Sequence, residues 1–82
     1  MTKTFHLTVA KVGENLFSGE AASATLPGAE GVFQILPNHE ALISELKAGE
    51  IEIKAESGSI EKISLEKGGI AEVSHNQATI LL

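Results

Sequence analysis

The chain has 82 residues, a net charge of −5, and neither cysteine nor tryptophan. At this length we expect one domain, residues 1–82, in which disulfides and thiolate metal sites are excluded. The basic residues are scattered lysines that form no patch, which argues against nucleic acid as a partner. No apolar run is long enough to span a bilayer, and the polar start "MTKTFHL" is unlike a signal peptide. We therefore expect no direct membrane insertion and no signal peptide.

Apolar and polar residues alternate in four segments of the chain, 5–10, 50–56, 62–66 and 77–82. A period of two is typical of strands with one buried and one exposed face. Glycine, proline and asparagine recur between these segments at short intervals, for example in a turn expected at Pro27-Gly28. This pattern predicts an all-β fold, a two-layer antiparallel β-sandwich or flattened barrel of short strands.

The apolar positions of the expected strands predict the hydrophobic core. Large aliphatic side chains and phenylalanine must supply it, because tryptophan and tyrosine are absent. The predicted core residues are Phe5, Leu7, Leu26, Ile51, Ile53, Ile63, Ile70, Val73 and Ile80.

The segment "NHEALISELK", residues 38–47, fits two kinds of secondary structure. Its apolar residues Leu42, Ile43 and Leu46 follow helical spacing, and Asn38 is a suitable N-cap. A strand over residues 42–46 is the alternative, because one or two turns are too few for periodicity to establish a helix.

No motif in the chain is typical of catalysis or of cofactor binding. His6, His39 and His75 lack the spacing of metal ligands, and no serine lies in a nucleophile elbow. The segment from Gly28 to Gly31 is unlike a phosphate loop, since Glu30 adds negative charge and a β-like run follows. We therefore predict no catalytic residue, no metal site and no cofactor.

The stretch "LPGAEGVFQILPNH", residues 26–39, is the most restricted part of the chain. Two Leu-Pro turns bracket a Gly-x-x-Gly segment and a short apolar run. Loops held by a rigid β-sandwich are common sites of binding residues. We therefore predict that this stretch is a surface for binding another protein.

Five motifs in the same order resemble one known family over about residues 5–81. The resemblance is to the N-terminal β-sandwich domain of the epsilon subunit of the F-type ATP synthase, called delta in mitochondria. The motifs are Leu16-Phe17-Ser18-Gly19, Pro27-Gly28-x-x-Gly31, Ile35-Leu36-Pro37-x-His39, Lys47-x-Gly49 and Gly68-Gly69-Ile70-x-Glu72-Val73.

The resemblance implies a non-catalytic subunit of the central stalk, or rotor, that docks the gamma subunit onto the c-ring. Such a subunit couples proton or ion transport to ATP synthesis, with one copy in each complex. It is peripheral, on the cytoplasmic face of a bacterial plasma membrane. The resemblance also favours a strand over residues 42–46. It places contacts to gamma and the c-ring at Gly28, Glu30, Gly31, Val32, Phe33, Pro37, Asn38, His39, Glu40 and Ala41.

The chain departs from the family pattern at several positions. Asn38 stands where the family usually has glycine, and because asparagine tolerates the left-handed conformation we expect the turn to be preserved. Val32 replaces a residue that is often polar or acidic, and Ala48 replaces a common proline. Most members continue into a two-helix hairpin, which the 82 residues do not include, so we expect no C-terminal helical hairpin.

The alternative is a stand-alone module that binds a peptide or a sugar. An acidic all-β domain of this size is compatible with either ligand. The absence of tryptophan and tyrosine argues against a sugar, because sugar sites usually use exposed aromatic residues.

Overall fold

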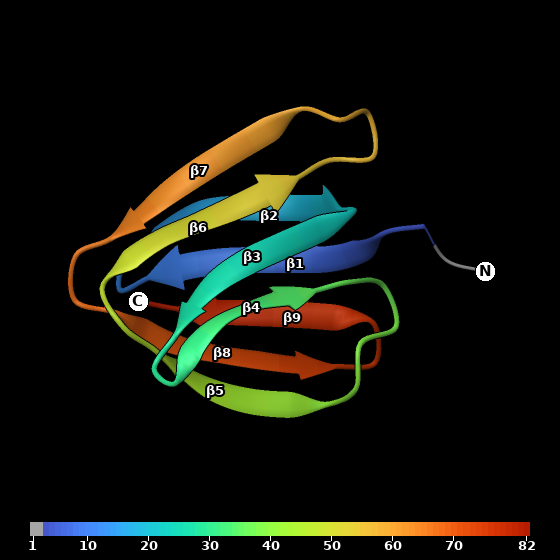
Figure 1. The fold of residues 1–82 in the computed structure, drawn as a ribbon. Coiled ribbons are helices and arrows are strands. Elements are labelled where there is room, and N and C mark those ends of the chain that lie inside the picture. The colour runs from blue at the N-terminus through green and yellow to red at the C-terminus, as the bar shows by residue number, and fades with distance from the viewer. Residues whose placement is uncertain (1–2) are drawn as a thin grey trace.

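The computed structural model describes residues 3–82 (Figure 1). These residues form nine strands, and none of them lies in a helix that could cross a membrane. The strands are β1 (Phe5–Lys11), β2 (Glu14–Ala21), β3 (Ser23–Gly28), β4 (Gly31–Ile35), β5 (Leu42–Leu46), β6 (Gly49–Lys54), β7 (Ile60–Leu65), β8 (Gly69–Ser74) and β9 (Gln77–Leu81).

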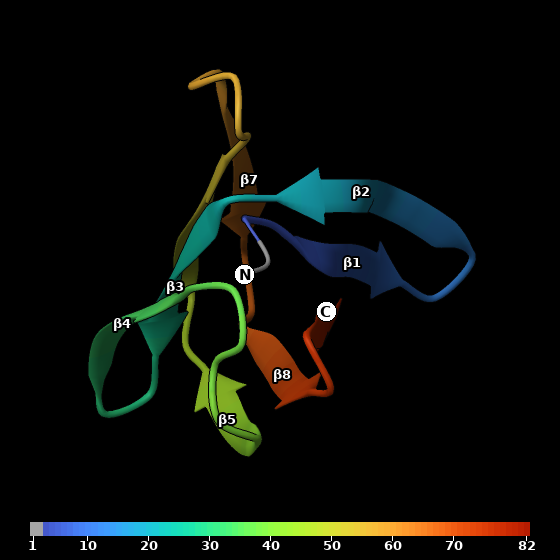
Figure 2. The same cartoon turned by 90° about the vertical axis from the view of Figure 1, so that its right-hand side faces the viewer.

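The strands form one curled sheet that makes two layers. Its order is β2-β1-β9-β8-β5-β3-β6-β7, and β4 pairs with β3 outside this path. The layer of β3, β4, β6 and β7 lies in front of the layer of β1, β2, β8 and β9 in Figure 1, and Figure 2 shows the curl from the side. β5 joins the layers, because it pairs with β8 along its length and with β3 at Gly28 opposite Leu46. The predicted two-layer β-sandwich is confirmed.

One strand pair differs from the expected antiparallel pattern. β1 and β9 run parallel, from His6 opposite Gln77 to Ala10 opposite Leu81, whereas the other pairs are antiparallel. Parallel neighbours cannot be joined by a tight hairpin and need a long connection between them. Here the seven intervening strands form that connection.

The buried residues agree with most of the predicted core. Phe5, Leu7, Leu26, Ile51, Ile53, Val73 and Ile80 are buried, and Ile63 is partly buried against them. The prediction for Ile70 is wrong, since this side chain is 50% exposed. Successive side chains of a strand alternate between faces, so Ile70 cannot share a face with Val73, three residues along β8.

The ambiguous segment is a strand, as the family resemblance favours. β5 pairs with β8 from Leu42 opposite Val73 to Leu46 opposite Gly69. Asn38 lies in a turn with φ of 63°, so it is not a helix N-cap. The turn expected at Pro27-Gly28 is displaced by two residues, because these residues end β3 and the chain reverses at Ala29-Glu30.

Candidate interaction surface

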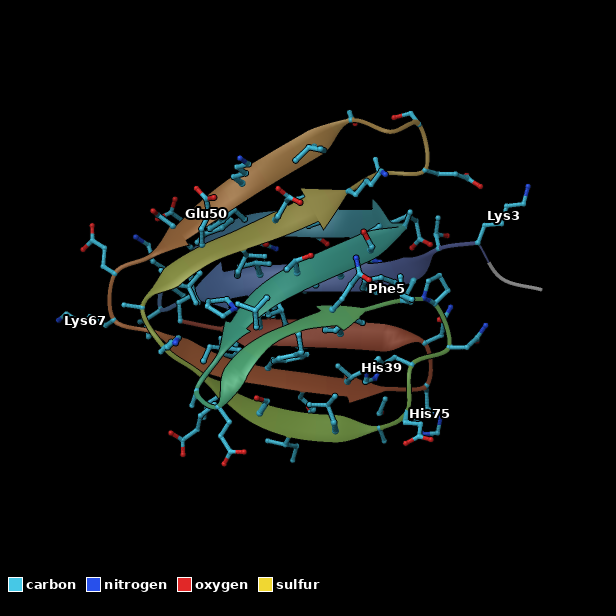
Figure 3. All side chains as sticks on the ribbon, viewed as in Figure 1. Lys3, Phe5, His39, Glu50, Lys67 and His75 are labelled. Carbon is cyan, nitrogen blue, oxygen red and sulfur yellow. The ribbon has the colours of Figure 1, made fainter. Side chains whose placement is uncertain are left out.

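The ten predicted contact residues lie in two groups at opposite ends of β4. We call residues 28–33 the hairpin tip and residues 36–41 the β4–β5 loop. At about 3.3 Å per residue, β4 spans roughly 13 Å from Gly31 to Ile35, and the β4–β5 loop continues beyond its far end. Figure 3 shows His39, in the loop, and His75 at one end of the sheet, with Glu50 and Lys67 at the other. The structure therefore does not bring the predicted residues together into one surface.

The hairpin tip is held firmly against β5. The Lys47 N–H donates to the Pro27 carbonyl oxygen and the Ala29 N–H donates to the Glu45 carbonyl oxygen, both at 2.9 Å. Pro27 itself is buried, whereas the turn residues beyond it are exposed. A rigid base therefore presents an exposed tip.

Two glycines allow the chain to reverse within the hairpin tip. Gly28 and Gly31 pair across the two-residue turn, and a Cβ on Gly28 would lie 2.8 Å from the ring of Phe33. Gly31 has φ of 139°, a conformation that disfavours side chains, although the space beside it is open. Val32 follows with 70% of its surface exposed. The tip thus combines a constrained backbone with an exposed apolar side chain.

A shallow groove of about 830 Å³ lies between the hairpin tip and β5. Of its lining residues, Glu30 and Glu45 are charged, and none is basic. Ile43 contributes an apolar side chain that is 75% exposed. The groove therefore combines apolar surface with negative charge.

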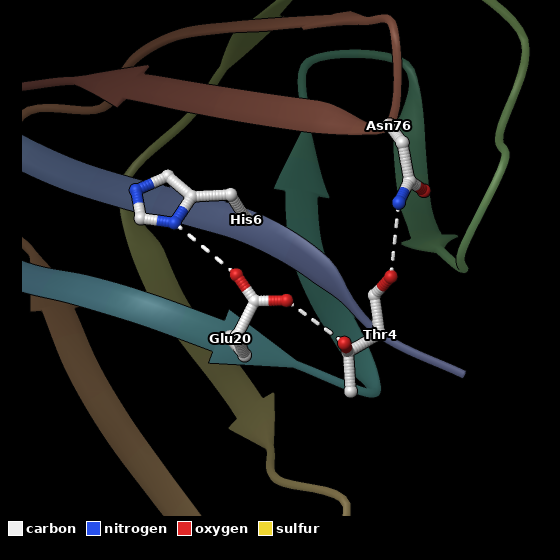
Figure 4. A network of polar contacts seen from close by, with 4 residues as sticks. All are labelled: Thr4, His6, Glu20 and Asn76. Carbon is white, nitrogen blue, oxygen red and sulfur yellow. Dashed lines mark hydrogen bonds and ion pairs between the residues drawn. The ribbon is translucent and has the colours of Figure 1, made fainter. Parts of the chain in front are cut away.

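Asn76 ties the β4–β5 loop to two other parts of the chain. Its Oδ1 accepts a hydrogen bond from the Asn38 N–H at 2.7 Å, and its Nδ2 donates to the Thr4 carbonyl oxygen at 3.0 Å. Figure 4 shows the second of these contacts. His75 and Asn76 form the β8–β9 turn with φ of 52° and 59°. The contact between Asn38 and Asn76 joins residues 38 positions apart, and no local sequence pattern reveals it.

Replacing Asn76 with glycine is expected to lower the free energy of unfolding by about 1–3 kcal/mol, because a part-buried hydrogen bond to Thr4 and an exposed one to Asn38 are lost. Glycine retains the positive φ of the turn, so backbone strain does not contribute. Urea unfolding followed by circular dichroism measures the change. His75→Gly in the same turn is the matched control and should cost less. Equal losses from the two variants would contradict a stabilising role for the Asn76 side chain.

The histidines have separate surroundings. His39 Nδ1 donates to the Glu40 carbonyl oxygen at 2.7 Å, which fixes the imidazole within the β4–β5 loop. His6 Nδ1 lies 3.3 Å from a carboxylate oxygen of Glu20, whose other oxygen accepts from the Thr4 hydroxyl (Figure 4). His6 and His75 are exposed. Residues 3–82 hold no group of three side chains suited to a metal ion.

Comparisons with known proteins agree on one family. The model of the β-sandwich domain of the ATP synthase delta/epsilon chain matches residues 4–82. The ATP synthase epsilon chain of Delftia acidovorans is 41% identical over 78 residues, which cover 95% of this chain and 56% of that protein. The epsilon chain of Chlorobium limicola is 37% identical over 79 residues, covering 96% of this chain and 89% of that one. Our chain therefore spans just over half of the Delftia protein and most of the Chlorobium protein.

Solved structures share the fold. A chain of the Euglena gracilis mitochondrial ATP synthase superposes with a TM-score of 0.91 at 24% identity, covering 99% of this chain and 51% of that chain. A chain from the central stalk and c-ring structure of the Tetrahymena thermophila enzyme gives 0.75 at 18% identity, covering 93% and 60%. These likenesses establish the architecture. The family match over residues 4–82, together with the curated relatives, shows that the chain belongs to the ATP synthase delta/epsilon chain family, as its β-sandwich domain.

Proposed function

We propose that the chain is a non-catalytic rotor subunit of an F-type ATP synthase. In this role it docks gamma onto the c-ring and so helps to couple proton or ion transport to ATP synthesis. The observation that carries the proposal is the family match over nearly the whole chain. The proposal assigns no active site, cofactor or metal to the chain, and places one copy in each complex at the cytoplasmic face of the membrane.

The two groups of predicted contact residues support contacts with two partners. A subunit that connects gamma to the c-ring needs rigid surfaces that face in different directions. The hairpin tip is anchored to β5, and the β4–β5 loop is anchored through Asn76, at opposite ends of β4. We assign the hairpin tip to the c-ring and the β4–β5 loop to gamma.

Variants at the two ends test this assignment. Valine disfavours the φ of 139° that Gly31 adopts, so Gly31→Val should distort the hairpin tip. We therefore expect this variant to bind the c-ring more weakly. His39→Ala removes the imidazole of the β4–β5 loop and should weaken binding to gamma. We expect each variant to weaken its interaction at least about fivefold in Kd, which corresponds to about 1 kcal/mol. Both Kd values are measured with purified gamma and purified c-ring, and ATP-driven proton pumping is measured in reconstituted vesicles.

His6→Ala is the matched control, because it removes an exposed histidine from β1 rather than from the β4–β5 loop. It should leave both affinities and pumping unchanged. Unaltered pumping by folded Gly31→Val and His39→Ala variants would refute the docking role. If Gly31→Val weakened binding to gamma and His39→Ala weakened binding to the c-ring, the assignment of the two ends would be reversed.

A further inference from the structure

β4 has an edge that is open and unprotected. In residues 3–82 three strands pair on one side only: β2 with β1, β7 with β6, and β4 with β3. Free strand edges usually carry charges, proline or bulges that block pairing with other chains. β2 carries glutamates and has a bulge in its pairing with β1, and β7 carries Glu61 and Lys62. β4, with the sequence GVFQI, has none of these features.

The hydrogen-bond pattern identifies the free backbone groups of β4. Because the Pro27 carbonyl oxygen accepts from the Lys47 N–H at 2.9 Å, this carbonyl points away from β4. Backbone groups of successive strand residues point to opposite sides, so the N–H and carbonyl of the adjacent Leu26 point toward β4, where the partner of Leu26 is Phe33.

Val32 and Gln34 lie on either side of Phe33, so their backbone groups point the other way, to the open edge. Two N–H donors and two C=O acceptors are thus available at the spacing of a β-ladder. Val32 and Gln34 are also exposed. The edge can accept another strand without any change in the pairing of β4 with β3.

The groove beside the tip of this edge indicates which strand fits. Its apolar lining includes Val32 and Ile43, and its charges come from Glu30 and Glu45 alone. The chain itself is acidic, so a second copy would bring more negative charge to the same place. An incoming strand with alternating apolar and basic side chains matches both the apolar surface and the carboxylates.

We propose that β4 binds an extended segment of a partner protein by strand addition, and that this segment alternates apolar residues with lysine or arginine. The backbone groups of Val32 and Gln34 hold the segment, and Glu30 and Glu45 attract its basic side chains. This inference goes beyond docking on the rotor and does not depend on it. Binding of such a segment by the isolated chain can succeed whether or not gamma or the c-ring is a partner.

The probe is a short peptide in which lysine and valine alternate, compared with a peptide in which glutamate replaces lysine. Backbone amide shifts of the 82-residue chain are recorded during titration. We expect saturable shifts and slower hydrogen exchange at Val32 and Gln34 with the basic peptide, and at least about tenfold weaker binding of the acidic one. Binding should also weaken as salt is added.

Gln34→Pro is the decisive variant, because it removes an N–H that faces the open edge and no N–H that faces β3. It should weaken binding of the basic peptide about tenfold, whereas Gln34→Ala, which keeps the N–H, should bind like the original chain. Val32→Pro provides the same test if Gln34→Pro does not fold.

Three results would overturn the proposal. The first is unchanged peptide binding by the folded proline variants. The second is equal binding of the basic and the acidic peptide, or binding of neither peptide. The third is a concentration-dependent dimer of the chain that Gln34→Pro abolishes, since a second copy would then occupy the edge.

Discussion

Replacing Gly68 with alanine is expected to reduce the free energy of unfolding by about 2–5 kcal/mol, a large part of the stability of a small domain. Gly68 is buried with φ of 85° between β7 and β8. A Cβ there would overlap the carbonyl oxygen of Leu46 and lie 3.2 Å from the carbonyl carbon of Lys47. Backbone strain and a clash with backbone atoms therefore add. Thermal and urea unfolding measure the loss.

Gly58→Ala is the matched control for Gly68→Ala. Gly58 also has a positive φ, 97°, but a Cβ there meets nothing within 4 Å. The Gly58→Ala variant should lose only the cost of placing a side chain at positive φ, about 1–2 kcal/mol of unfolding free energy. Similar losses from the two variants would mean that the β5–β6 turn moves freely away from position 68.

Truncating Ile53 to alanine is expected to cost about 2–5 kcal/mol, since it leaves a cavity between the two layers. Ile53 is 2% exposed on β6, opposite Ala24 of β3 and Glu61 of β7. Urea unfolding gives the change. Ile43→Ala on β5 removes the same atoms from an exposed position and should change stability by less than about 0.5 kcal/mol. A neutral Ile53→Ala would contradict the described core.

The strands were predictable where alternation is long, as in residues 5–10 and 50–56. Ile70 is apolar yet exposed because Ala71 and Val73 occupy the inward face of β8, and hydrophobicity alone does not indicate which face a residue takes. β5 has only five residues, a length that fits helical and strand spacing equally. The parallel β1–β9 pair leaves no local signal, because it depends on how the whole chain folds back.

The restricted backbone of residues 26–39 was predictable from the sequence, but the shape of the candidate surface was not. Proline and glycine indicated that residues 26–39 are restricted, and the tight hairpin at Gly28 and Gly31 is what the structure contains. Closeness in sequence suggested one surface, whereas the extended β4 separates its two ends. The contact between Asn38 and Asn76 requires the folded sheet, so no pattern within one segment reveals it.

The parallel pairing of β1 with β9 has a consequence for synthesis on the ribosome. Because β1 is made before β9, Leu7 and Val9 lack their neighbours Ala78 and Ile80 until residues 77–81 have emerged. Contacts between residues so far apart in sequence carry a high loop-closure entropy and form slowly. The nascent chain therefore leaves this edge of β1 unpaired until β9 has emerged, and chaperones have that interval in which to bind its apolar side chains.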